Sequence, residues 1–504
     1  MIASAAANAF PLLSAVTFLP LLGGIAALPL KDRPDLCRIL CLLVALADLA
    51  LVALLPCYGD LFGALAGGGG AVLAEDFAWI PRFGIRYTLA LDGLSYLLVV
   101  MTAFLGVLAV LVSWREITRR TASYHAFLLF TQTSAMGVFL ARDLFLFYLF
   151  WEVQLVPMFF LIGIWGHERR REAALKFFLF SIAGGLFMLL AVIGLYLAHG
   201  AQTGDYTFAL PALLASPATG AAGAWLFAAF LLAFAIKMPI VPVHTWLPDA
   251  HTQAPTAGSL ILAGVLLKTG AYALVRWAFP LFPQASAASA TLLVVLGVGG
   301  LFYVSWIALA QTDVKRLIAY SSIGHMGLIV LGVAVWDRIS LAGSVLQMVN
   351  HALTTGALFI MVGMLAERTD SREMSDFGGL WKRMPVFSAF FLLFCLASAG
   401  LPGLGNFVSE LLILVGSYQV RPVAAVFAFA GMVFTLVYVL RLVQGTLFGE
   451  PGGRSAALAA LPDLSARETA ILVPLALSTL YLGLAPSGAL ELLHGPIGGL
   501  LGLR

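Results

Sequence analysis

The chain has 504 residues, of which 61% are hydrophobic and 11% are charged, with a formal net charge of +3. Because a soluble domain carries about a quarter charged residues, this composition excludes an ordinary water-soluble protein. The small, dispersed charge also excludes a nucleic-acid-binding surface. The four cysteines form no CxxC pair and have no cluster of histidine partners, which favours packing thiols over an iron–sulfur or zinc site.

Apolar stretches of about 20 residues, separated by short polar pieces, follow one another along the sequence. This pattern predicts an all-α polytopic membrane protein with about fourteen transmembrane helices. The first stretch lacks the basic region of a signal peptide before it, so we interpret it as a retained span. The predicted spans cover residues 11–30, 37–56, 88–112, 123–141, 143–163, 173–198, 224–250, 256–279, 291–311, 315–335, 339–366, 386–417, 422–447 and 467–487.

The short loops differ in their content of lysine and arginine. Loops after odd-numbered spans are basic, as in "GHERRRE" and "QTDVKR", whereas a loop after an even-numbered span, "AHGAQTGDYTF", carries no lysine or arginine. Short loops rich in lysine and arginine stay in the cytoplasm of a bacterial cell. We therefore expect the basic loops on the cytoplasmic side of the inner membrane and both termini on the periplasmic side.

Spans seven and twelve contain helix-breaking residues in mid-run, in "KMPIVP" and "SAGLPGLGNFVSE". They lie five spans apart, and an odd offset reverses the direction of the chain. Spans four to eight and nine to thirteen are therefore predicted to form two inverted five-helix repeats, as in many transporters. The predicted organisation is 1–122 for spans one to three, 123–279 and 280–448 for the two repeats, and 449–504 for a loop and span fourteen.

Several ionisable residues lie inside the predicted spans, where a charged group costs about 2.5–3.5 kcal/mol. A static ion pair or a hydrogen bond between helices is the alternative interpretation, but buried ion pairs contribute little net stability. Groups that exchange protons, next to broken helices that admit water, suit a proton relay. The candidates are Glu152, Lys237, Lys268, Glu410, His325, His351 and, just after the first break, His244.

Five stretches resemble the antiporter-like subunits of respiratory complex I. The resemblance extends over nearly the whole chain, and the block at 237–272 is its most specific part. The stretches are "LALDGLSYLLVVMT", "FYLFWEVQLVPMFFLIGIWG", "KMPIVPVHTWLPDAHTQAPTAGSLILAGVLLKTGAY", "QTDVKRLIAYSSIGHMG" and "GLPGLGNFVSE".

The resemblance implies a role for each candidate. Glu152 and Lys237 would form the ion pair of the proton channel, Lys268 would be the central relay lysine, and Glu410 the terminal group. His325 and His351 resemble the histidines that connect centre and exit. The sister chains L and N usually place lysine where this chain has Glu410, which favours the chain M branch, as does the lack of a long helical extension after span fourteen.

The resemblance also implies a function and partners. The chain would translocate protons within NADH-quinone oxidoreductase, beside other membrane subunits that include chains L and N, and would couple indirectly to the hydrophilic NADH-oxidising arm. Flavin and iron–sulfur clusters are expected in partner subunits and no cofactor or metal in this chain. The alternative is a subunit of a multi-subunit cation/proton antiporter. A third interpretation, a membrane scaffold without transport, is disfavoured by the charges inside the spans.

Overall fold

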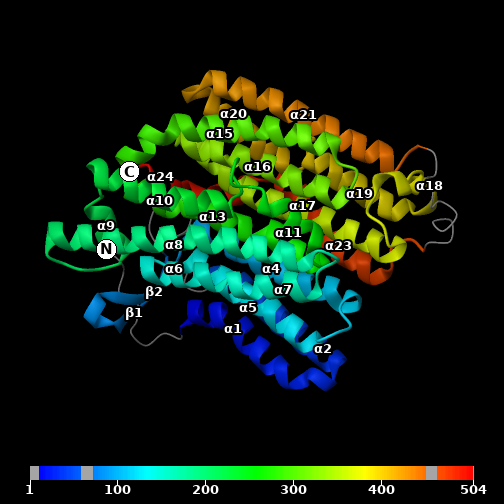
Figure 1. The fold of residues 1–504 in the computed structure, drawn as a ribbon, viewed down its shortest axis with the longest axis horizontal. Coiled ribbons are helices and arrows are strands. Elements are labelled where there is room, and N and C mark those ends of the chain that lie inside the picture. The colour runs from blue at the N-terminus through cyan, green and yellow to red at the C-terminus, as the bar shows by residue number, and fades with distance from the viewer. Residues whose placement is uncertain (1–10, 58–71, 450–461, 503–504) are drawn as a thin grey trace.

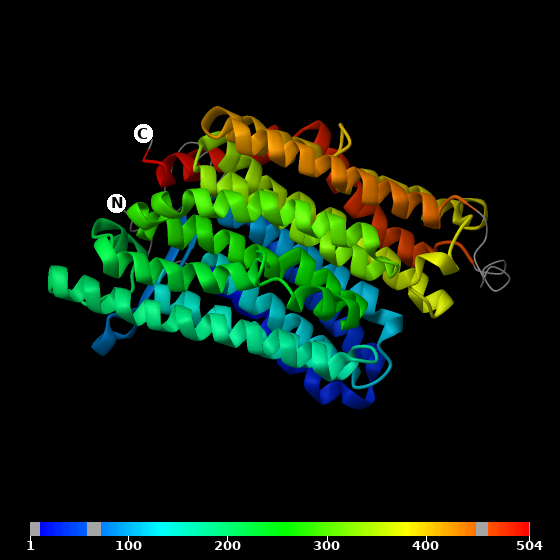
Figure 2. The same ribbon diagram turned by 45° about the horizontal axis from the view of Figure 1, so that its top comes forward.

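A computed structural model describes residues 11–57, 72–449 and 462–502. The long helices run side by side along one common direction and form a bundle several helices deep (Figures 1 and 2). The N-terminal elements are α1 (Leu12–Ala27), η1 (Leu28–Asp32), α2 (Pro34–Leu54), η2 (Leu55–Cys57), β1 (Leu73–Ile80), η3 (Pro81–Phe83), β2 (Ile85–Leu91) and α4 (Gly93–Glu116).

The helices that follow come in two groups on either side of residue 282. The first group is α5 (Thr121–Leu140), α6 (Leu144–Val153), α7 (Leu155–Trp165), α8 (Arg170–Thr203), α9 (Leu210–Ala215), α10 (Gly220–Lys237), α11 (Trp246–Gln253), α12 (Thr256–Ile261), η4 (Leu262–Leu266), α13 (Leu267–Ala273), η5 (Leu274–Ala278) and α14 (Phe279–Leu281). The second is α15 (Pro283–Ala310), α16 (Val314–Val335), α17 (Arg338–Thr369), η6 (Met374–Asp376), α18 (Leu380–Arg383), α19 (Pro385–Ser398), α20 (Gly405–Val420), α21 (Pro422–Thr446), α23 (Ala466–Leu484) and α24 (Ser487–Leu500).

Within the described residues, twelve helices are long and apolar enough to cross a membrane. They confirm a polytopic helical membrane protein and coincide with twelve of the predicted spans. The other two predicted spans fall on α5, which carries many polar residues, and on α19 with α20, which are short. The total of fourteen and the inverted repeats remain predictions.

A β-hairpin precedes the third predicted span. Strands β1 and β2 pair antiparallel, with Leu73 opposite Leu91. The predicted start of this span at residue 88 is wrong, because residues 88–91 belong to β2. The helix starts only after Asp92, whose carboxylate accepts a 2.9 Å hydrogen bond from the Ser95 amide in a capping box. An apolar strand and an apolar helix start look alike in sequence.

Both predicted helix breaks are confirmed. The first lies between α10 and α11, where Pro239 and Pro242 cannot continue a helix. The second lies between α19 and α20, where Gly400 and Gly403 have φ angles of 75° and 92°. Such positive φ angles suit glycine and end a regular helix. Two internal helix ends therefore lie inside the bundle.

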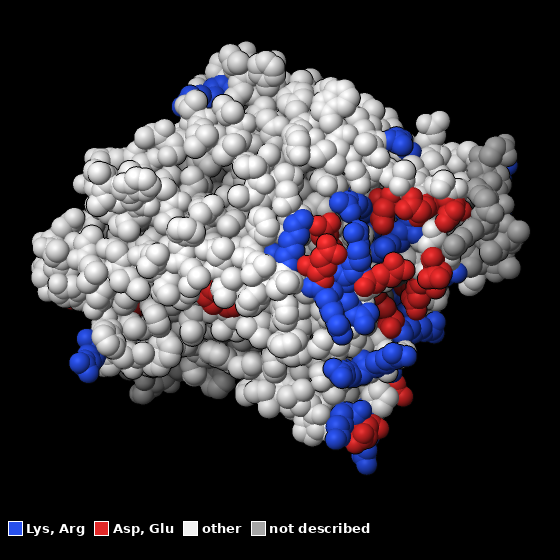
Figure 3. All heavy atoms as spheres, in the orientation of Figure 1, with Lys and Arg blue, Asp and Glu red and all other residues white. Residues whose placement is uncertain are grey.

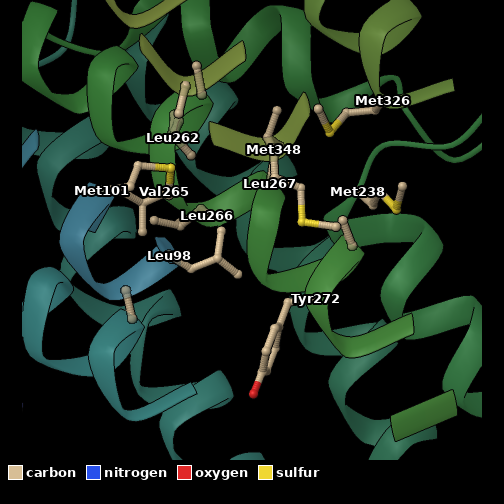
Figure 4. Packing of buried hydrophobic residues seen from close by; sticks show 14 of the residues in the cluster. Leu98, Met101, Met238, Leu262, Val265, Leu266, Leu267, Tyr272, Met326 and Met348 are labelled. Carbon is tan, nitrogen blue, oxygen red and sulfur yellow. The ribbon is translucent and has the colours of Figure 1, made fainter. Parts of the chain in front are cut away.

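The span from Thr256 to Leu281 is the centre of the bundle, since every residue of its apolar window is buried. Figure 4 shows Leu262, Val265 and Leu266 of this span packed beside Leu98 and Met101 of α4. A helix without a lipid-facing side can carry polar groups that its neighbours satisfy. Lys268 is such a group.

Charged side chains gather at one end of the bundle. In the view of Figure 3, lysine, arginine, aspartate and glutamate cluster at the end where α8 begins and α17 ends, whereas the rest of this face is nearly uncharged. The cluster includes the ion pairs Lys176–Asp249 and Arg372–Asp313. This asymmetry matches the distribution of basic loops in the sequence. That this end faces the cytoplasm remains a prediction.

Candidate functional site

Lys268 lies in the middle of the central span and is fully buried. It belongs to α13, which is flanked by the π-helical segments η4 and η5. Such wide turns occur mostly at functional positions in helices. The Lys268 ammonium donates a hydrogen bond back to the carbonyl oxygen of Ala263 in η4. The distorted helix therefore supplies the Lys268 ammonium with a hydrogen-bond acceptor at a depth where lipid supplies none.

Four predicted residues form a line that starts at this ammonium. Lys268 Nζ lies 2.7 Å from His351 Nδ1 on α17. The rings of His351 and His325, on α16, are 5.2 Å apart between centroids and nearly perpendicular. His325 Nδ1 then lies 3.3 Å from Glu410 Oε1 on α20. Lysine, two imidazoles and a carboxylate from four helices thus follow one another at distances short enough for proton exchange, directly or through one water.

The far end of the line has additional polar partners that the sequence did not reveal. Gln347 Nε2 donates a 3.2 Å hydrogen bond to Glu410 Oε1, and the Ser409 hydroxyl donates to the side-chain oxygen Oε1 of Gln347. Ser398 Oγ lies 3.3 Å from His325 Nε2. One signal was present, because Gln347 precedes His351 by one helical turn and shares its face.

Gly400 makes room for the Glu410 carboxylate. A Cβ atom on Gly400 would lie 2.6 Å from Glu410 Oε2, and the backbone there already has a positive φ. Both conditions favour glycine over any L-residue with a side chain. The second helix break therefore shapes the surroundings of Glu410.

Glu152 and Lys237 are arranged differently. They interact electrostatically, but no direct ion pair within 4.0 Å joins them among the described residues. Lys237 Nζ lies 5.1 Å from the centroid of the Trp151 ring, a cation–π contact. Glu152 packs against Gly185 of α8, and its Oε1 has no hydrogen-bond partner in the described chain. In place of the ion pair that the resemblance implies, Glu152 and Lys237 interact electrostatically at more than 4.0 Å.

His244 lies in the first break, away from this line. Its ring packs edge-on against Tyr303 of α15, with 5.6 Å between the ring centroids. In the part of the chain that the structure describes, His244 Nδ1 has no hydrogen-bond partner. Among the described residues, no contact joins His244 to a member of the Lys268–Glu410 line.

A further histidine, His251 of α11, lies near the Lys268 end of the line and was missed in the sequence. Its ring stacks on Phe359 with 4.5 Å between centroids, and within the described residues neither ring nitrogen has a hydrogen-bond partner. It interacts electrostatically with both Lys268 and His351. Its position in "PDAHTQ", on a short helix after the break, was the available signal.

The side chains of the line are of the kinds that transfer protons. No group of three or more histidine, cysteine, aspartate or glutamate side chains within residues 11–57, 72–449 and 462–502 is arranged to hold a metal ion. The ammonium, imidazole and carboxylate groups are the ones that accept and release protons in proteins.

Comparisons with known proteins identify the family of the chain. Residues 141–435, which include all seven predicted site residues, match the family described as NADH:quinone oxidoreductase/Mrp antiporter, TM. The chain is 47% identical over 428 residues to NADH-quinone oxidoreductase subunit M of Escherichia coli (strain K12), with 84% of each chain covered. It is also 47% identical over 468 residues to subunit M of Pseudomonas aeruginosa, covering 90% of this chain and 91% of that one.

Two solved structures resemble the fold closely. A chain of respiratory complex I from Thermus thermophilus with bound NADH has a TM-score of 0.86 and 33% sequence identity, covering 97% of this chain and all of that one. A chain of the Mrp complex from Dietzia sp. DQ12-45-1b has a TM-score of 0.84 at 22% identity and 98% coverage of both. The second likeness concerns the fold alone.

Proposed function

The chain belongs to the NADH:quinone oxidoreductase/Mrp antiporter transmembrane family, and on that premise we propose that it is the antiporter-like, proton-translocating M-type subunit of an NADH-quinone oxidoreductase. The observation that carries the proposal is the line Lys268–His351–His325–Glu410, with Lys268 Nζ 2.7 Å from His351 and His325 3.3 Å from Glu410. Ionisable side chains inside a membrane span destabilise the protein, and where they occur they usually serve a function.

Protons follow an ordered route in this proposal. A proton from the charged end of the bundle reaches Lys237, where the nearby Glu152 carboxylate stabilises the ammonium. It passes to Lys268, and from there through His351 and His325 to Glu410. Glu410 releases it towards the opposite side of the membrane. Each transfer moves a proton between groups on facing helices, so the protein need not move a helix for every step.

The step from Lys237 to Lys268 is the one without direct contacts. The helices approach closely there, since a Cβ on Gly270 of α13 would lie 3.0 Å from Phe234 O of α10. His251 is the bridging group in our proposal: neither of its ring nitrogens has a hydrogen-bond partner among the described residues, and it interacts electrostatically with Lys315 and with Lys268. Water at the helix break would complete the step.

Electron transfer is assigned to other subunits of the complex. In the proposal, NADH oxidation and quinone reduction use flavin and iron–sulfur clusters in partner subunits, and this chain lies beside chains L and N in the bacterial inner membrane. It is part of an enzyme only at the level of the complex. Purified alone, it is expected to show no flavin or iron–sulfur absorbance, and a stoichiometric cluster would contradict this division of labour.

The family description also covers Mrp antiporters, so a cation/proton antiporter subunit is the second candidate. Purification of the chain from its native membrane in mild detergent separates the two. Co-purification with flavin- and iron–sulfur-containing subunits supports the oxidoreductase. Co-purification with membrane subunits alone, and cation-driven proton exchange without NADH, would instead support the antiporter.

The orientation is tested separately. Reporter fusions in the loop at residues 166–172 should score as cytoplasmic, and fusions in the loop after α8, at residues 204–208, as periplasmic. The basic residues concentrated at one end of the bundle support this orientation (Figure 3). The reverse pattern would overturn both the orientation and the direction of the proposed route.

A further inference from the structure

A cavity of about 700 Å³ opens at the charged end of the bundle. It lies between the loop that joins α4 to α5 and the turn that joins α7 to α8. The route proposed above does not use it. The charged residues and the indole that line it are Arg119, Arg120, Arg170, Arg171, Glu116 and Trp165.

No described carboxylate forms an ion pair with any of the four arginines of this cavity, although Arg170 donates a 3.2 Å hydrogen bond to the Gly166 carbonyl oxygen. Arg119, Arg120 and Arg171 are exposed, and Arg170 is half-buried. Elsewhere at this end, arginines are paired, as Arg372 is with Asp313. Four guanidinium groups around one cavity repel each other unless an anion joins them.

The one carboxylate in the lining is occupied elsewhere. Glu116 Oε1 accepts hydrogen bonds of 3.0 and 3.1 Å from the amide and the hydroxyl group of Thr256. Glu116 also interacts electrostatically with the buried Lys315. One carboxylate oxygen is therefore held by α12, while Glu116 Oε2 is buried without a hydrogen-bond partner in the described chain. Four arginines outnumber this single carboxylate, so an anion in the cavity would face an excess of positive charge.

Two helices add to this excess. Helix α5 begins directly after Arg120 and α8 begins at Arg170, and neither N-cap residue forms a side-chain capping hydrogen bond. The first-turn residues Arg170 and Arg171 of α8 line the cavity, and α5 begins one residue beyond its lining, so the positive dipole ends of both helices lie at this side of the bundle, with Glu172 the one acidic residue in the first turn of α8. Arginine forks and helix N-termini are together well suited to phosphate oxygens.

The cavity continues into a lipid-facing apolar surface. Trp165, whose indole donates a 2.8 Å hydrogen bond to the Arg119 carbonyl, lies at the boundary. One turn and more along α7, Phe160 and Val156 are 37% and 50% exposed, and Leu175, on the neighbouring helix α8, is 52% exposed. A free anion would use only the polar half of this surface. A molecule with a phosphate head and apolar tails fits both halves.

We propose that this cavity binds the headgroup of an anionic phospholipid, of the phosphatidylglycerol class, from the membrane leaflet at the charged end. The arginines and the first turns of α5 and α8 hold the phosphodiester, and the acyl chains lie along α7 and α8. Basic pockets between helix ends at the cytoplasmic leaflet recognise lipid headgroups in this way. A lipid held there joins the α4–α5 loop to the α7–α8 turn and is expected to stabilise the assembled subunit.

The test uses the assembled, delipidated complex in detergent. Short-chain phosphatidylglycerol is titrated and the midpoint of thermal unfolding is followed, with short-chain phosphatidylcholine and inorganic phosphate as parallel ligands. Only phosphatidylglycerol should give a strong saturable shift. In the triple variant Arg119→Gln, Arg120→Gln, Arg171→Gln, half-saturation should need about a hundredfold more lipid, because three basic groups that each contribute about 1 kcal/mol together account for about two powers of ten.

Matched variants separate charge from fold. The corresponding three Arg→Lys changes should keep binding within about threefold, because each lysine keeps its charge but loses the guanidinium fork. Lys31→Gln with Arg33→Gln, exposed at the same end but outside the cavity, should leave binding unchanged. If the triple variant fails to assemble, Arg171→Gln alone should still weaken binding measurably.

Several outcomes would overturn the proposal. Parent-like binding by the triple variant would place the lipid elsewhere. Equal effects of phosphate and phosphatidylglycerol would indicate a site for a free anion, and equal effects of phosphatidylcholine would indicate non-specific lipid contact. Loss of a neighbouring subunit on native gels, with lipid binding retained, would show that the arginines face a protein partner.

Discussion

Lys237 and Lys268 are both buried lysines at the centre of the bundle, yet they are held in opposite ways. Lys268 contacts the Ala263 carbonyl and His351 directly, and His325 contacts Glu410. Between these two contacts the His351 and His325 rings lie 5.2 Å apart between centroids, with no hydrogen bond from His351 Nε2 to any described residue. Lys237 has an aromatic ring beside it and interacts with Glu152 only across a distance. The Lys237 region therefore depends on one remote countercharge, and the Lys268 region depends on a series of contacts.

This difference predicts how each region responds to damage. When a buried ammonium loses its countercharge, the full cost of desolvation remains and the lysine is driven to its neutral form. A network with several donors tolerates a loss better. Glu410 is contacted by both His325 and Gln347, and Gln347 is held in turn by Ser409. We therefore expect proton pumping to be lost when Glu152 is changed, and to fall by steps when groups around Glu410 are changed.

Glu152→Gln should have the largest effect. It removes the carboxylate that stabilises the Lys237 ammonium while keeping the shape of the side chain, so NADH-driven proton uptake into vesicles should fall by about tenfold or more. Native gels should still show the assembled complex. Glu168→Gln, at an exposed position in the α7–α8 turn, is the control. Normal pumping with glutamine at 152 would remove Glu152 from the mechanism.

Lys268→Met should come next. It removes the titratable group at the head of the line and keeps most of the apolar stem in a fully buried position, so folding should survive. Proton uptake per NADH oxidised should fall severely, by about tenfold, because no other group in the line replaces the central acceptor. Lys382→Met, on the exposed face of α18, is the matched control. A Lys268→Met variant that pumps at the parent rate would break the route at its centre.

Glu410 should show a graded response. Glu410→Ala removes the last acceptor, and proton uptake should fall by about fivefold, within the usual range for a proton-transfer group. Glu410→Lys should be milder, because a lysine at this depth can also exchange protons. The resemblance to the sister chains L and N implies a lysine at this position in them. The same vesicle assay decides. If the lysine variant is the worse of the two, the proposed exit role is wrong.

Gly400→Ala should have the smallest effect of the series. The new Cβ would lie 2.6 Å from Glu410 Oε2, so the carboxylate must shift away from His325, and pumping should fall about twofold. In addition, the positive φ of an alanine there should lower the stability of the folded protein by about 1–2 kcal/mol. Gly204→Ala is a matched control, because its φ of 78° is equally strained while no atom lies within 4 Å. Equal effects of the two changes would show that backbone strain alone matters.

The sequence indicates single residues but not the contacts between helices. Lys268 and Glu410 stand out because any charge in an apolar run does, and Pro239 and Pro242 reveal a break by their chemistry alone. Gln347 does not stand out, since its importance comes from a partner 63 residues away. The gap between Glu152 and Lys237 depends on helix packing and is likewise invisible in the sequence.

A cycle of histidine variants tests the central claim, that one continuous line conducts protons from Lys268 to Glu410. His351→Leu and His325→Leu are measured singly and together for proton uptake per NADH oxidised, in complexes of verified assembly. Since the two rings lie 5.2 Å apart in a single series, the double variant should pump no worse than the more damaged single variant. If instead the two losses multiply, the histidines act on separate paths and the single line is contradicted.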